Sequence, residues 1–160
     1  MVTLEFLRSH SLFGGIMDKD LTKIRTLFKE DHFAKGDEII KEGEPGDRLY
    51  FIHDGSVEIL KKIPSSENDA QKRLAVLKKG NTFGEMELID VEERVATVKA
   101  LENTETLSLS NSDLYVISKW NLETFTIIIM NLAREISRRL RIMDALVASS
   151  LFAEDEESHK

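Results

Sequence analysis

The sequence contains no cysteine. The chain can therefore form neither a disulfide nor a thiolate metal or catalytic site, and this composition agrees with a reducing compartment. No apolar run reaches the roughly 18 to 20 residues that a membrane-spanning helix needs, and the N-terminus lacks the basic and apolar regions of a signal peptide. We therefore expect a cytoplasmic protein without membrane contact.

Positive charge is in deficit as well. The chain has 22 Lys and Arg against 29 Asp and Glu, a formal net charge of −7. A surface that binds nucleic acid needs clustered excess Lys and Arg, so we expect no nucleic-acid partner. The four histidines are scattered without a paired-histidine motif, and no carboxylate has a predictable partner at catalytic spacing. The sequence therefore predicts neither a metal site nor catalytic residues, and it favours a protein that is not an enzyme.

The hydrophobic period divides the N-terminal two thirds of the chain into two parts. Residues 3–30 are predicted to be helical, with Asp18 as the cap of an amphipathic helix. From residue 33 to residue 109, short β-branched or aromatic runs alternate with turn residues, which predicts an all-β barrel or a double-sheet roll. The predicted strands are Glu38–Ile40, Leu49–His53, Ser56–Lys62, Leu74–Leu77, Val95–Leu101 and Glu105–Ser110. The polar segment 61–73 is predicted to be a mobile hairpin loop.

The C-terminal third returns to a helical period. Apolar residues recur every three or four positions and predict a helix over about 112–150. This apolar stripe lies on the β-domain or pairs with a second copy of the chain. We expect one domain over residues 1–150 and a flexible acidic tail over 151–160. The arginines interpreted as the solvated face of this helix are Arg134, Arg138, Arg139 and Arg141.

Two motifs carry most of the functional information. The first, IIKEGEPGDRLYFIHDG at 39–55, contains glycines, which allow a positive φ at little cost, and so predicts tight turns between strands. The second, FGEMELIDVEERVATVKA at 83–100, has Gly84 and Glu85 before a short predicted helix and Arg94 nine residues later. Glu85 can accept a hydrogen bond from a ribose 2′-hydroxyl, and Arg94 can donate to a phosphate oxygen. Each feature alone also fits a turn or a surface ion pair, but together they suit a cyclised ribose phosphate.

The two motifs, in this order and followed by a long helix, resemble those of the cyclic nucleotide-binding domain family. This family includes the regulatory subunit of cAMP-dependent kinase and the catabolite-activator-type regulators. The resemblance covers residues 4–148 and implies an eight-stranded double-sheet β-roll with N-terminal helices and a long C-terminal helix. It also implies that this last helix acts as a lid and often as a dimer seam. The residues implied to contact the ligand are Gly84, Glu85, Met86, Glu87, Arg94, Val95 and Ala96.

The sequence departs from the family pattern at two of these positions. Family members usually have Gly, Ala or Ser at the position of Glu87, whose charge opposes a bound phosphate. The Glu87 carboxylate either points to solvent or folds back onto Arg94 and takes the place of the phosphate. Val95 lacks the hydroxyl that can contact the ligand in this family, which favours cAMP over cGMP.

These features support two functional hypotheses. In the first, the chain is a cAMP-sensing regulatory module that signals through its C-terminal helix to a protein partner or to the other copy in a homodimer. In the second, it is a degenerate domain that no longer binds nucleotide and serves as a scaffold for protein–protein interaction. No cofactor other than the suspected cAMP is predicted. A DNA-binding regulator is disfavoured because the sequence given stops shortly after the long helix.

Overall fold

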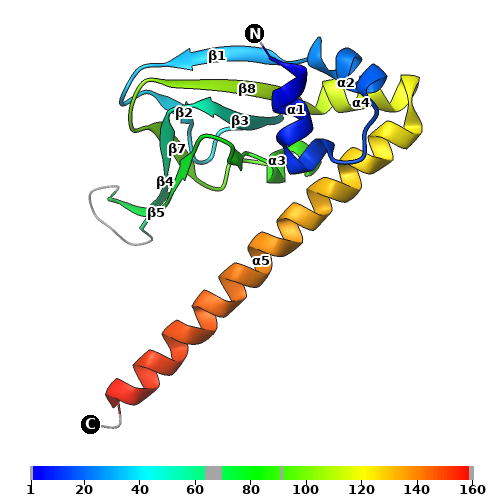
Figure 1. Ribbon diagram of the computed structural model, residues 1–160. Coiled ribbons are helices and arrows are strands. Elements are labelled where there is room, and N and C mark those ends of the chain that lie inside the picture. Colours follow the sequence, from blue (N-terminus) through cyan, green and yellow to red (C-terminus); the bar gives the residue numbers. More distant parts are fainter. Residues whose placement is uncertain (1, 64–69, 91, 159–160) are drawn as a thin grey trace.

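The computed structural model describes residues 2–63, 70–90 and 92–158, with side chains up to residue 149 (Figure 1). The helices are α1 (Leu4–Ser9), the 3₁₀ helix η1 (Ser11–Phe13), α2 (Asp18–Arg25), α3 (Met86–Ile89), α4 (Asn111–Trp120) and α5 (Leu122–Ser158). The strands are β1 (Lys29–Phe33), β2 (Glu38–Ile40), β3 (Arg48–Asp54), β4 (Ser56–Lys62), β5 (Gln71–Lys78), β6 (Thr82–Phe83), β7 (Thr97–Ala100) and β8 (Thr104–Ser110). Helix α5 runs past the β-strands and extends away from them.

The eight strands form two four-stranded antiparallel sheets. One sheet has the order β1-β8-β3-β6 and the other the order β2-β7-β4-β5. This arrangement confirms the predicted double-sheet roll with helices at both ends. The hairpin predicted over 61–73 joins β4 to β5, but the loop is shorter, because residues 61–62 belong to β4 and residues 71–73 to β5. The Ile63 N–H donates to the Ala70 carbonyl at 2.9 Å. The centre of that loop, residues 64–69, lies outside the described residues, so its predicted mobility stays a prediction.

Two strands were absent from the sequence-based prediction. Strand β1 begins at Lys29, inside the segment predicted to be helical, and the helical region ends at Arg25 instead. Its sequence KEDHF is mostly polar and lacks the β-branched residues that indicate a strand, and it is positioned by pairing with β8 over its whole length. Strand β6 has two residues, too few to show a period.

The prediction that Asp18 caps a helix is wrong. Asp18 is the first residue of α2, whose N-cap is Met17 without a side-chain hydrogen bond. The Asp18 carboxylate instead accepts two hydrogen bonds from Arg8 at 2.6 and 2.9 Å, which tie α2 to α1 on the surface.

The buried residues form two hydrophobic clusters. The larger joins one face of the β1-β8-β3-β6 sheet, including Phe51 and Leu107, to the helices, including Ile24 and Ile128. The smaller cluster lies between the two sheets and is made of Ile40, Ile52, Val57, Phe83 and Val98. The larger cluster packs against the N-terminal half of α5, where Ile128 and Leu132 are buried. Every described side chain from residue 140 to residue 149 is exposed. No helix in the described part of the chain has both the length and the hydropathy needed to cross a bilayer.

The C-terminal helical segment differs from the single helix predicted over 112–150. It consists of α4 and α5, separated at Asn121, whose backbone is extended with φ −155° and ψ 97°. The Asn121 side chain caps α5 by accepting from the Thr124 N–H at 3.1 Å. Asn is a favoured N-cap residue, so a new helix begins here although the apolar period of the sequence continues. Helix α5 also continues past residue 150 to Ser158. The division into a domain of 1–150 and a flexible tail of 151–160 stays a prediction.

Asp20 joins α2 to the start of α5 through a buried carboxylate. It is 4% exposed and accepts from the Thr124 hydroxyl and from the Asn121 amide, both at 3.1 Å. We expect Asp20→Ala to lower the free energy of unfolding by about 1–3 kcal/mol, because the buried Thr124 hydroxyl loses its acceptor. Urea denaturation measures this loss.

Asp18→Ala is the matched control for Asp20→Ala. It removes the same carboxylate two residues earlier in α2, but from a solvent-exposed pair with Arg8. Its effect should be much smaller, because exposed ion pairs contribute little to stability. Equal losses in the two variants would contradict the structural role given to Asp20.

Candidate functional site

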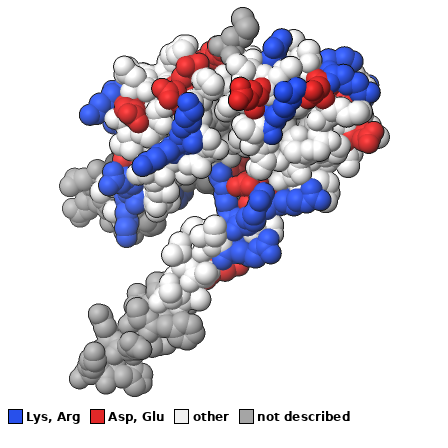
Figure 2. All heavy atoms as spheres, in the orientation of Figure 1, with Lys and Arg blue, Asp and Glu red and all other residues white. Residues whose placement is uncertain are grey.

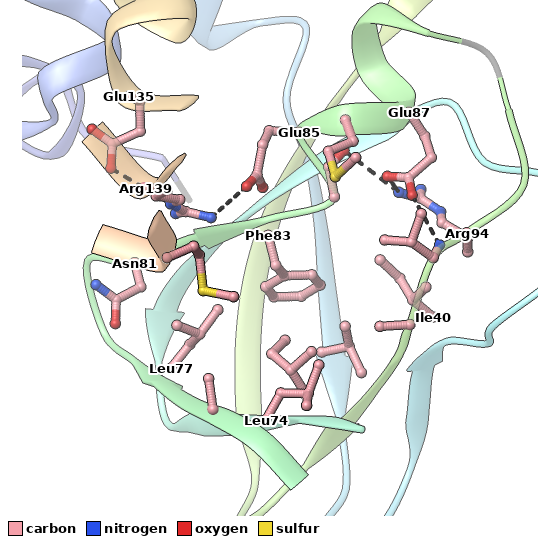
Figure 3. A pocket seen from close by; sticks show the side chains of 18 of the residues that line it. Ile40, Leu74, Leu77, Asn81, Phe83, Glu85, Glu87, Arg94, Glu135 and Arg139 are labelled. Carbon is pink, nitrogen blue, oxygen red and sulfur yellow. Dashed lines mark hydrogen bonds and ion pairs between the residues drawn. The ribbon is translucent and has the colours of Figure 1, made fainter. Parts of the chain in front are cut away.

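A cavity of about 590 Å³ lies between the β-roll and α5. Its wall includes all seven residues that the sequence predicted to contact a ligand. Glu85 and Arg94 of the second motif therefore share one cavity (Figure 3). Strand β5 contributes Leu74 and Leu77 to the opposite wall, and Phe83 lies between these leucines and the charged residues. The volume is within the range of small-molecule sites. Whether the seven residues contact a ligand stays a prediction.

Arg94 is buried at one end of this cavity. Its side chain is 6% exposed, and its Nη1 donates to Glu87 Oε2 at 2.9 Å. Its Nη2 donates to the Arg48 carbonyl at 3.1 Å. Both terminal nitrogens of the guanidinium therefore donate within the chain, to a carboxylate and to the backbone.

Two glycines make room for the Arg94 guanidinium. A Cβ at Gly46 would lie 1.9 Å from Arg94 Nε, and a Cβ at Gly84 would lie 2.7 Å from Arg94 Nη1. Gly43, Gly55 and Gly84 have the positive φ expected of turn glycines, but Gly46 does not. Gly46 is therefore required for a different reason, the close approach of Arg94.

Glu87 takes the second of its two predicted orientations. Its side chain is 5% exposed, and besides the bond from Arg94 its Oε1 accepts from the Val95 N–H at 3.3 Å. Arg94 is the residue predicted to donate to the ligand phosphate, and Val95 is among the residues that the family resemblance implies to contact the ligand. The carboxylate of Glu87 therefore occupies the place predicted for that anion, and the orientation toward solvent is excluded.

Glu85, the predicted ribose-binding carboxylate, is paired with α5. Its Oε1 accepts from Arg139 Nη1, and Arg139 Nη2 donates to the carbonyl and to the hydroxyl of Thr82, each at 2.9 Å. Arg139 also lies 3.7 Å from a Glu135 oxygen. These contacts link the start of the second motif to the C-terminal helix.

The role of Arg139 was missed by sequence reasoning, which placed it on the solvated face of the helix. Lys and Arg gather on α5 beside the β-roll in Figure 2, and one of several closely spaced arginines reaches the cavity. Neither the helical period nor the charge distinguishes Arg139 from Arg138, which forms an ion pair with Glu135 of the same helix at 2.9 Å. The angle between α5 and the β-roll determines that Arg139, and not Arg138, lines the cavity.

An aromatic pair lies beside Arg94. The rings of Tyr50 and Phe83 are stacked, with centroids 5.0 Å apart, and the guanidinium carbon of Arg94 lies 6.0 Å from the Tyr50 ring centre. Burial raises the pKa of the Tyr50 hydroxyl, and the charge of Arg94 opposes that rise. The uncharged ring offers its face to the cation, which favours the observed position of Arg94.

His10 lies between α1 and η1, where the charges of Glu135 and Arg139 on α5 act on its imidazole. Its Nδ1 accepts from the Leu12 N–H at 3.3 Å, and its ring lies edge-on to Phe51. Burial lowers the pKa of His10 below the ordinary 6.5; the charge of Arg139 acts in the same direction, and Glu135 and the Gly80 carbonyl act against it. The imidazolium is therefore disfavoured in the folded state.

We expect the stability of the protein to fall as the pH drops below about 6.5 because of His10. The unfolded state binds a proton there that the folded state does not, so this contribution is complete above the unfolded pKa and is lost as the pH falls toward the folded pKa. His10→Asn keeps a side-chain acceptor for the Leu12 N–H but cannot titrate. Urea denaturation at about pH 5 and about pH 7.5 should show a smaller difference in this variant than in the native chain.

Carboxylates with a lowered pKa affect the stability at a lower pH than His10 does. A hydrogen bond from Arg8 lowers the pKa of Asp18, and one from Lys61 lowers the pKa of Glu42, so both lose their contributions only below their ordinary values. An unchanged difference between the two pH values in His10→Asn would show that another group is responsible.

Comparison with known proteins identifies the architecture. The family model described as the cyclic nucleotide-binding domain matches residues 30–119. The chain belongs to the cyclic nucleotide-binding domain family. Both the predicted family and the predicted β-roll are thereby confirmed, and the family is one of nucleotide-binding regulatory domains.

Relatives within this family include eukaryotic and bacterial regulators. The chain is 32% identical over 108 residues to the cAMP-dependent protein kinase regulatory subunit of Debaryomyces hansenii, covering 68% of this chain and 22% of that protein. It is 29% identical over 138 residues to the cyclic AMP receptor protein of Thermus thermophilus, covering 86% of this chain and 61% of that protein. The chain thus spans less than two thirds of each of these two relatives.

Solved structures show the same fold. The crystal structure of a cyclic nucleotide-binding domain from Methylobacillus flagellatus has a TM-score of 0.79 and 25% sequence identity, with 91% of this chain and 81% of that chain covered. The similarity extends beyond the residues matched by the family model, so it includes flanking helices.

Proposed function

We propose that the chain is a non-catalytic regulatory module of the cyclic nucleotide-binding family that carries its own anion in place of the ligand phosphate. One observation supports this above all others: the buried Glu87 carboxylate is bound to Arg94 at 2.9 Å. A cyclic phosphate must either displace Glu87 or lie beside its charge, and both cost free energy. The module therefore acts through protein contacts without requiring cyclic nucleotide.

Helix α5 is the proposed output element. It is tied to the second motif by the bond between Arg139 and Glu85, and further along it exposes the apolar side chains of Leu140 and Met143, which are 60% and 56% exposed. Exposed apolar residues three apart on one helix suit contact with a second helix. A protein partner or a second copy of the chain would cover this surface, as the sequence predicted for a homodimer.

A second candidate function is the sensing of cAMP. It is favoured by the single cavity that holds Glu85 and Arg94 together with the five other predicted contact residues. In this case cAMP would displace Glu87 from Arg94 and Arg139 from Glu85, and the second displacement would release α5. Because Val95 lacks a hydroxyl, cAMP is preferred to cGMP in this proposal.

Thermal unfolding in the presence of cAMP and cGMP distinguishes the two candidates. A ligand that binds the folded state raises the midpoint of unfolding in proportion to the logarithm of its concentration above Kd. With about 1 mM of either nucleotide we expect no shift for the native chain. A shift of several degrees with cAMP would reject the self-occupied site and establish the sensor.

A further inference from the structure

The charges that line the cavity are already paired, and their sum is negative. The lining residues include two arginines, Arg94 and Arg139, and three carboxylates, those of Glu85, Glu87 and Glu135. Arg94 is bound to Glu87, and Arg139 is bound to Glu85 and lies near Glu135. An anion entering this cavity gains no unpaired cation and meets an excess of one negative charge. An uncharged ligand avoids that repulsion.

Both site carboxylates keep unused acceptor capacity. No donor among the described residues is bonded to Glu85 Oε2, and each oxygen of Glu87 accepts one hydrogen bond. An ionised carboxylate offers about four acceptor positions. The polar groups of a ligand that meet Glu85 and Glu87 must therefore be donors, such as hydroxyls.

The remaining walls are apolar and open. Leu74 on β5 and Leu146 on α5 are each 58% exposed, although both line the cavity. Large apolar side chains this exposed on two facing elements are covered when an apolar body lies between them. The occupant thus combines hydroxyl donors at one end with a flat, weakly polar body at the other.

We infer that the cavity binds an uncharged nucleoside in preference to a nucleotide. Ribose hydroxyls donate to Glu85, the free 5′-hydroxyl donates to Glu87 where a phosphate would meet repulsion, and the base lies between β5 and α5. The inference rests on the proposed function, because it needs Glu87 to hold Arg94. It adds a ligand class that the self-occupied site still accepts.

The test compares adenosine, guanosine, 5′-deoxyadenosine and cAMP by thermal unfolding and calorimetry on the native chain. At one hundred times its Kd, a ligand raises the unfolding midpoint of a domain of this size by roughly 5–10 °C. We expect such a shift with adenosine or guanosine and none with cAMP. 5′-Deoxyadenosine should bind about 10-fold or more weakly than adenosine, because it lacks the hydroxyl that donates to a charged acceptor.

The outcomes separate this inference from the proposed function. If none of the nucleosides and no cyclic nucleotide shifts the midpoint, the nucleoside inference is overturned and the self-occupied module stands. A cAMP shift equal to or larger than that of the nucleosides overturns both. Equal affinity for adenosine and 5′-deoxyadenosine would reject the assigned contact with Glu87 and with it the reason for preferring a nucleoside.

Discussion

Glu87→Ala should raise the affinity of the chain for cAMP by roughly 5-fold to nearly 1,000-fold. A like charge about 4 Å from a phosphate costs about 1 kcal/mol at the dielectric constant of water and about 4 kcal/mol at the value typical near a protein surface. Removing Glu87 abolishes this repulsion, and it also frees Arg94 Nη1 and the Val95 N–H, the groups that Glu87 now occupies. Calorimetric titration with cAMP measures the gain.

Glu93→Ala is the matched control for this gain. Glu93 lies next to Arg94 in sequence, but its side chain is exposed, so its charge is screened by salt. The control changes the net charge by the same amount and should leave cAMP binding almost unchanged. If the two variants gain equally, overall charge governs affinity and the specific role of Glu87 is rejected.

The fold was largely predictable from the sequence because its signals are local. Glycine-rich turns and β-branched runs gave β2, β3, β4, β5, β7 and β8, and the apolar period gave most of α5. The missed strand β1 is polar and depends on its pairing with β8, a contact between residues more than seventy positions apart. The break at Asn121 was hidden because the apolar period continues across it.

The site was predictable in its members but not in its connections. The motif placed Glu85, Glu87 and Arg94 around one cavity, but both orientations of Glu87 satisfied the sequence. The orientation depends on whether Arg94 is buried, and that in turn depends on the space left by Gly46, forty-eight positions earlier. The sequence could not distinguish Arg139 from the neighbouring arginines of its helix, because the angle of α5 is set by packing in the larger hydrophobic cluster.

Arg94→Ala should lower the free energy of unfolding by about 3–5 kcal/mol. The substitution leaves the Glu87 carboxylate 5% exposed without its cation, and a buried charge that loses its partner is strongly destabilising. Glu87→Ala should cost less, since Arg94 keeps the carbonyls of Arg48 and Gly84 as acceptors at 3.1 and 3.5 Å. Urea denaturation of both variants measures the difference.

The double variant Glu87→Ala/Arg94→Ala decides between burial of the pair and simple loss of volume. If the unpaired carboxylate causes the loss, removing it as well should restore part of the stability, so the double variant should be more stable than Arg94→Ala alone. If the loss comes from the cavity left by the long side chain, the second deletion enlarges that cavity and should destabilise the chain further. Arg73→Ala breaks an arginine–glutamate pair whose arginine is 59% exposed, and it should cost less than about 1 kcal/mol. The change in stability from Arg94→Ala to the double variant therefore shows whether Glu87 and Arg94 act as one neutral buried pair.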